Sequence, residues 1–127
     1  VSGGDRPLVV SYASSPPAEV VYADPPIDRP RSVVLERTCV RQIELAAVLR
    51  GARHPDAARR LVEFMLSPSW QEELPLTNFV RPVVASTPLP KVFTDFAPEV
   101  PTPIVVPVPE VARERDRWLT AWRDAMG

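Results

Sequence analysis

The 127-residue sequence contains very little of the chemistry on which catalytic and metal sites depend. It has one cysteine and one histidine, so it offers neither an internal disulfide nor a metal site built from several Cys and His ligands. A Ser-His-Asp or Cys-His catalytic group would have to use His54, which is more simply a residue flanking the helix expected to start at Pro55. We therefore expect no catalytic residue, no metal ligand and no cofactor, and a binding protein rather than an enzyme.

An excess of charge of one sign and long apolar runs are also missing. The 15 basic and 16 acidic residues give a formal net charge of −1. The chain therefore lacks the excess of basic residues that is typical of nucleic-acid-binding domains. No run of 18 apolar residues occurs, so no membrane-spanning helix is predicted. Hydrophobic residues make up 45% and charged residues 24%, which is typical of a globular chain. The length of 127 residues predicts a single domain over residues 1–127.

The first residues, Val-Ser-Gly-Gly-Asp-Arg-Pro, have neither the basic nor the apolar segment of a signal peptide. There is also no initiating methionine. We expect the chain to be a part of a longer protein.

Glycine is scarce and proline abundant, with 4 and 17 residues, so regular elements should be short and often interrupted. The expected strands are 7–12, 32–38 and, with a helix as the alternative, 39–49. The expected helices are 18–23, 55–66, 70–74 and 110–126. Apolar residues at helical spacing support the helix over 55–66 best: Ala58, Leu61, Val62, Met65 and Leu66. Together these elements predict an α/β fold.

Four segments, together with the closing helix, resemble the C-terminal part of thiamine-binding periplasmic proteins of ABC importers. They are PLVVSYASSP (7–16), ERTCVRQIE (36–44), LRGARHPDAARRLVEFMLSPSWQ (49–71) and PLTNFVRPV (75–83). Those proteins belong to the type II substrate-binding group, so the resemblance implies the second lobe and C-terminal helices of a two-lobed fold. It also implies extracytoplasmic capture of thiamine or a thiamine phosphate, in the periplasm or at the cell surface, and delivery to a permease. Its partners would be the permease subunits and the missing N-terminal lobe.

The same resemblance implies where the ligand binds. Tyr12 matches a pocket tyrosine of the family and Phe79 matches a pocket aromatic residue, whereas Ala18 stands where some members have a second tyrosine. Aromatic faces suit the cationic thiazolium of thiamine, because each cation–π contact contributes about 0.5–2 kcal/mol. Core packing is the structural alternative for both aromatic residues.

Three serines complete the expected binding set: Ser11, Ser14 and Ser15. Their hydroxyl groups suit hydrogen bonds to the polar atoms of the ligand. Helix capping and turn formation explain them equally well.

Other functions remain open at this stage. A ferric-ion site of the same fold would need an adjacent pair of tyrosines, but Tyr12 and Tyr22 are ten residues apart. A polyamine-binding protein of the same fold is another alternative. A third is a domain that binds a protein partner and no small ligand.

Overall fold

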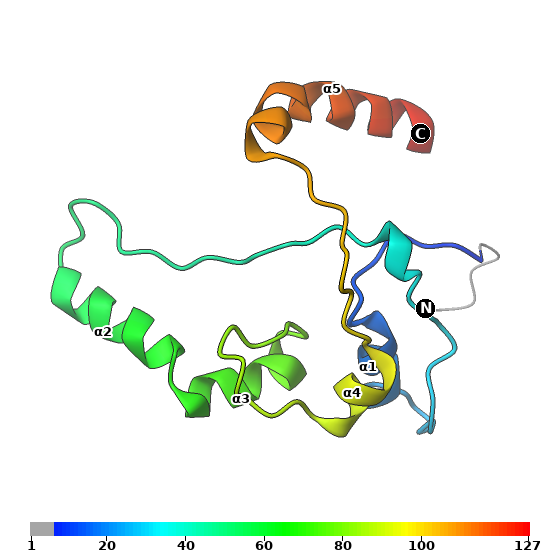
Figure 1. The fold of residues 1–127 in the computed structure, drawn as a ribbon, viewed down its shortest axis with the longest axis horizontal. Helices are drawn as coiled ribbons and strands as arrows, with labels where there is room; N and C mark the ends of the chain where they lie inside the picture. The colour runs from blue at the N-terminus through cyan, green and yellow to red at the C-terminus, as the bar shows by residue number, and fades with distance from the viewer. Residues whose placement is uncertain (1–6) are drawn as a thin grey trace. The chain divides into compact units, whose positions relative to one another are not determined.

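The computed structural model describes residues 7–127, so the stretch Val1–Arg6 that was compared with a signal peptide lies outside the described residues. Its elements are α1 (Ser15–Val21), the 3-10 turn η1 (Glu36–Thr38), α2 (Pro55–Met65), α3 (Pro68–Thr77), α4 (Lys91–Phe96) and α5 (Val108–Met126) (Figure 1). The chain divides into two compact units. Unit 1 comprises residues up to Val34 and Ile43–Glu99, and unit 2 comprises Leu35–Gln42 and Val100–Gly127.

Helices were predicted well where apolar periodicity and proline agree. The helix predicted over 55–66 is α2, which starts at Pro55, with His54 at its N-cap position. Proline suits this position because its missing N–H would be unpaired there in any case. The helix predicted over 110–126 is α5, which begins two residues earlier. His54 is thus the flanking residue that the sequence indicated.

The shorter helices differ from the prediction in their bounds. The helix expected over 18–23 starts at Ser15, because Pro16 and Pro17 fit within its first turn. The helix expected to end before Pro75 continues to Thr77. Pro75 is almost completely buried, and its burial compensates for the backbone hydrogen bond that proline cannot donate. Helix α4, among four prolines, was not predicted.

The three predicted strands were wrong. Across residues 7–127 the only β-pairing is an isolated parallel bridge between Val40 and Ile104. In it the N–H of Ile104 donates to the carbonyl of Cys39 over 2.8 Å. Segments 7–12 and 43–49 are extended or irregular without a ladder, and Glu36–Thr38 turns as a 3-10 helix. A strand requires a neighbour that pairs its N–H and C=O groups. The described residues are therefore rich in helix, which is compatible with part of a binding protein. The β-sheet that the predicted α/β fold requires is absent from residues 7–127.

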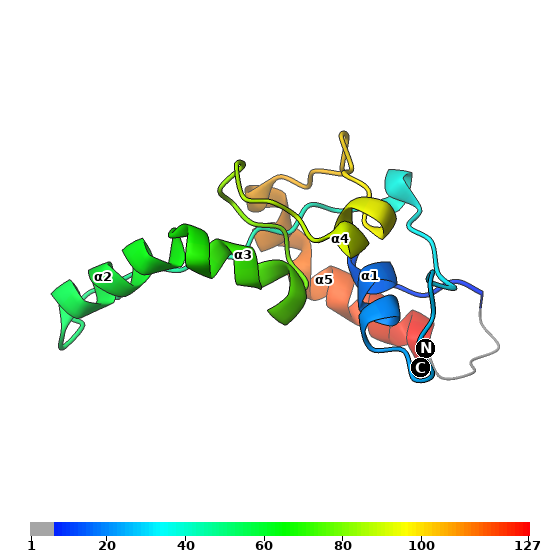
Figure 2. The same cartoon turned by 90° about the horizontal axis from the view of Figure 1, so that it is seen from below.

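The core of unit 1 lies where α1 packs against α4, which run side by side in Figures 1 and 2. Phe93 of α4 is 1% exposed and Ala97 just after it is 3% exposed. Pro17 of α1 is also fully buried. Helices α2 and α3 follow one another directly and contact through the edge-to-face pair of Phe64 and Trp70, whose ring centroids lie 5.5 Å apart.

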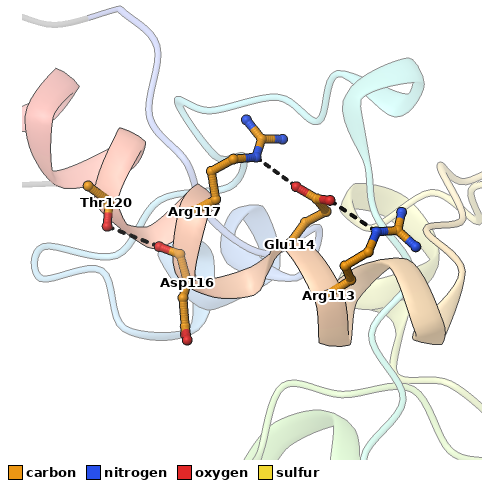
Figure 3. A network of polar contacts seen from close by, with 5 residues as sticks. All are labelled: Arg113, Glu114, Asp116, Arg117 and Thr120. Atoms are coloured by element: carbon orange, nitrogen blue, oxygen red, sulfur yellow. Dashed lines mark hydrogen bonds and ion pairs between the residues drawn. The ribbon is translucent and has the colours of Figure 1, made fainter.

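Unit 2 consists of the Val40–Ile104 bridge and α5. Helix α5 carries a charge cluster in which Glu114 accepts hydrogen bonds from Arg117 over 2.7 Å and from Arg113 over 3.1 Å (Figure 3). These hydrogen bonds, that from Arg117 first, hold the pKa of Glu114 below its ordinary value. The cluster is solvated and contributes little to stability. No helix within residues 7–127 is long and apolar enough to cross a membrane.

Candidate functional site

Three aromatic rings of unit 1 form a stack that runs from the core to the surface. The Phe79 ring lies 6.1 Å from the Phe93 ring at an interplanar angle of 26°, and 5.4 Å from the Tyr22 ring at 48°. Phe93 is buried, Phe79 is half-buried and Tyr22 is 70% exposed. Phe79 is therefore neither a pure core residue nor a free surface residue, because one neighbour anchors it and the other faces solvent.

The backbone of Phe79 adopts a conformation that bulky residues avoid. Its φ is +54°, in the left-handed region, immediately after Asn78 ends α3. Such a conformation costs a non-glycine residue about 1–3 kcal/mol and persists only where the surroundings enforce it. Backbone strain of this kind is often found at binding sites.

Gln71 fixes the segment that follows Phe79. Its side chain is 3% exposed and donates to the Met65 carbonyl over 2.6 Å. Its side-chain oxygen accepts from the N–H groups of Val83 (2.9 Å) and Val84 (3.3 Å). Two residues earlier in the same segment than Val83, Arg81 donates to the carbonyl of Ala97 over 2.5 Å. These contacts tie the start of α3 and residue 97 to the loop over 78–84.

Tyr12 and the three serines gather before and within the first turn of α1. Tyr12 is 68% exposed, and its carbonyl accepts from the N–H of Ser15 over 3.0 Å. The hydroxyl groups of Ser11 and Ser15 share a hydrogen bond of 2.6 Å. Ser14 is the N-cap residue, although its side chain makes no capping hydrogen bond. Its hydroxyl group is therefore not used in the way that the capping explanation requires.

The five predicted binding residues thus lie at the two ends of α1. Four of them are at its N-terminal end, and Phe79 contacts Tyr22, which directly follows its C-terminal end. A seven-residue helix is about 10 Å long, so a ligand that touches both groups must be extended. The contact between Phe79 and Tyr22 was missed from the sequence, because the two residues belong to segments far apart in the chain.

Glu19 holds the loop after α1 against the helix. One of its carboxylate oxygens accepts from the hydroxyl of Ser32 (2.8 Å) and from the N–H groups of Ser32 and Arg31 (3.1 Å each). Burial alone would raise the pKa of Glu19, but the hydrogen bonds from Ser32 and Arg31 outweigh it and lower the pKa below its ordinary value. Glu19 is thus a structural carboxylate engaged with its own loop.

An open, mostly apolar hollow of about 430 Å³ lies beside α3. Its lining residues are Phe64, Ser69, Trp70, Glu73, Leu74, Thr77 and Asn78. None of the predicted binding residues lines it. Within residues 7–127 no group of three or more His, Cys, Asp or Glu side chains is arranged to hold a metal ion.

The geometry does not identify a ligand, but two known proteins with similar sequences are named for one. The chain is 35% identical to the thiamine-binding periplasmic protein of Brucella suis over 121 residues, which are 94% of this chain. It is 29% identical to the protein of that name from Escherichia coli over 123 residues, or 97% of this chain. The chain is homologous to thiamine-binding periplasmic proteins. The resemblance of the four segments is thereby confirmed.

The homology covers only part of these relatives. The chain spans about a third of their length, 35% for the Brucella suis protein and 36% for the Escherichia coli protein. No family model matches the chain, and no solved structure matches it significantly. The thiamine-binding periplasmic proteins are therefore relatives of this chain over about a third of their own length.

Proposed function

We propose that this chain contributes part of the binding site of an extracytoplasmic thiamine-binding protein that serves an ABC importer. The observation that carries the proposal is the 35% identity to the Brucella suis protein over 94% of the chain. The relatives are named as binding proteins, and we propose that this chain likewise captures its ligand without catalysis. Its location would be the periplasm or the cell surface.

The proposed site uses aromatic faces for the cation and hydroxyl groups for the polar atoms. Tyr12 is exposed and Phe79 is half-buried, so each can offer aromatic surface to a different part of an extended ligand, one of them to the delocalised thiazolium. Ser11, Ser14 and Ser15 would hydrogen-bond the ligand. Since Ser11 and Ser15 already share a hydrogen bond, each retains capacity for a further partner.

The remainder of the binding site would come from the N-terminal lobe of a type II two-lobed fold, with the ligand between the lobes. Bound ligand would then be released to the permease. The relatives' length beyond the matched third supports a second lobe of this kind.

Calorimetric titration tests the proposed function. The complete product of the reading frame that encodes this chain is titrated with thiamine, thiamine monophosphate, spermidine and ferric citrate. We expect heat of binding with thiamine or its phosphate and none with the other two. Binding of spermidine or ferric citrate without thiamine would instead support a polyamine or ferric-ion protein of the same fold, and no binding at all would favour a partner-interaction domain.

A further inference from the structure

We propose that Tyr22 is a specificity-determining residue that contacts the cationic ring of the ligand together with Phe79. The inference rests on the proposed function and extends it, because Tyr22 is not among the residues that the family resemblance implies. It is carried by a contact that only the three-dimensional structure reveals, between a ring at the end of α1 and a ring in the loop after α3.

The position of Tyr22 is fixed by the helix it follows. It is the C-cap residue of α1, and its N–H donates to the carbonyl of Ala18 over 3.0 Å. Residues four apart lie on the same face of a helix, so Tyr22 follows Ala18 along one side of α1. Ala18 has only a methyl group. Tyr22, one turn later on the same side of the helix, provides the aromatic surface there.

The exposure of Tyr22 leaves most of its ring available for contact with a ligand. A tyrosine that only fills a core buries most of its ring, whereas Tyr22 stays 70% exposed although it already contacts Phe79. Phe93 supports Phe79 from the core side. The stack therefore has a buried, an intermediate and an exposed ring, and its exposed end is an aromatic surface held in place.

The angle between the two outer rings suits a flat cation. At 48° the planes of Tyr22 and Phe79 are tilted rather than parallel, so the two rings present faces in different directions. A delocalised cation is attracted to each ring face within about 6 Å of its centroid. The strained backbone of Phe79 is consistent with a ring held in place for binding.

The test measures affinity for a charged and an uncharged ligand in matched variants. The proteins are the complete product, Tyr22→Leu, Tyr22→Phe and Phe79→Leu. The control is Phe64→Leu, which removes a half-exposed aromatic ring of unit 1 that pairs with Trp70 and not with the rings of the stack. The ligands are thiamine and its neutral thiazole alcohol half. Thermal melts establish that each variant is folded.

We expect Tyr22→Leu to weaken thiamine binding about three- to thirtyfold, with Tyr22→Phe close to the parent and Phe64→Leu unchanged. The affinity for the neutral thiazole should change less than that for thiamine. Thiamine binding that is unaltered in Tyr22→Leu but weakened in Phe79→Leu would overturn the role of Tyr22 alone. A parent protein that does not bind thiamine would overturn the proposed function and the role of Tyr22 with it.

Discussion

At the scale of single residues, the left-handed backbone of Phe79 is the feature with the clearest energetic consequence. The left-handed backbone conformation costs a residue with a Cβ about 1–2 kcal/mol of conformational free energy, and it costs glycine nothing comparable. The Phe79 ring offsets this cost through its contacts with Phe93 and Tyr22. Removing the ring therefore leaves the strain without its compensation.

This predicts an unusual order of stability for two truncations. Phe79→Ala should be less stable than Phe79→Gly by about 0.5–1 kcal/mol, because alanine keeps the strained backbone while glycine relieves it. Urea unfolding of the two variants measures the difference. At a position with ordinary φ, glycine would be the less stable of the two, so that order would show that the left-handed conformation does not persist in solution.

Also at the residue scale, the Gln71 side chain makes three hydrogen bonds to the backbone. Gln71→Leu should destabilise the protein by about 2–4 kcal/mol, because it leaves the N–H groups of Val83 and Val84 and the carbonyl of Met65 without their partner. Denaturant unfolding measures the loss, with the exposed neighbour Glu72→Leu as the matched control. A loss as small as that of the control would mean that water replaces these hydrogen bonds without cost.

At the scale of elements, Glu19 couples α1 to the loop that follows it. Its folded-state pKa lies below the ordinary value of 4.5 because Ser32 and Arg31 donate to the carboxylate despite its burial. The sign follows from linkage: a lowered carboxyl pKa stabilises the folded state fully above the unfolded pKa, and this stabilisation is lost as the pH falls through the folded pKa.

We therefore expect acid to destabilise the parent more than Glu19→Gln. Melting temperatures at pH 7 and at intervals below pH 4.5 should drop more steeply for the parent, and Glu72→Gln serves as the control for loss of one carboxylate. Parallel curves for the parent and Glu19→Gln would show that the three hydrogen bonds do not depend on the charge of Glu19.

The elements also explain how much the sequence could predict. Helices α2 and α5 follow from local information, namely apolar spacing and an initial proline. The tyrosine and serines before α1 are neighbours in sequence, but the resemblance to thiamine-binding proteins, not local information, singled them out, and their role stays a prediction. The predicted strand over 39–49 was wrong because its apolar alternation gives a preference but no partner, and pairing is a property of distant chain. The neighbours of Phe79 were missed for the same reason, since Tyr22, Phe79 and Phe93 come from three separate segments.

At the scale of the whole molecule, apolar surface exceeds what the small core can cover. Among the exposed residues, Val10, Leu45 and Leu49 are 88%, 90% and 78% exposed. Where such side chains lie next to one another, they form a surface suited to association. The proposed second lobe would cover part of this surface.

We expect the 127-residue chain on its own to self-associate and to bind thiamine only weakly. Losing half of a binding free energy of about 10 kcal/mol moves the dissociation constant to the order of 0.1 mM or weaker. Light scattering and calorimetry on the same sample measure both properties. Submicromolar binding by a monomeric chain would place the whole site within these residues and contradict the two-lobe proposal.

The bridge between Val40 and Ile104 also determines the order in which the two units can be completed during synthesis. Residues 35–42 leave the ribosome before residues 43–99, and their partners in 100–127 follow only afterwards. The residues of unit 1 that precede 35 and the segment 43–99 are therefore all available before 100–127, and domains generally fold from the N-terminus as they emerge. Unit 1 can assemble around Phe93 before residues 100–127 have emerged, whereas unit 2 must wait for them. A ribosome that stalls before Val100 would leave residues 35–42 as an unpaired segment for chaperones and proteases to recognise.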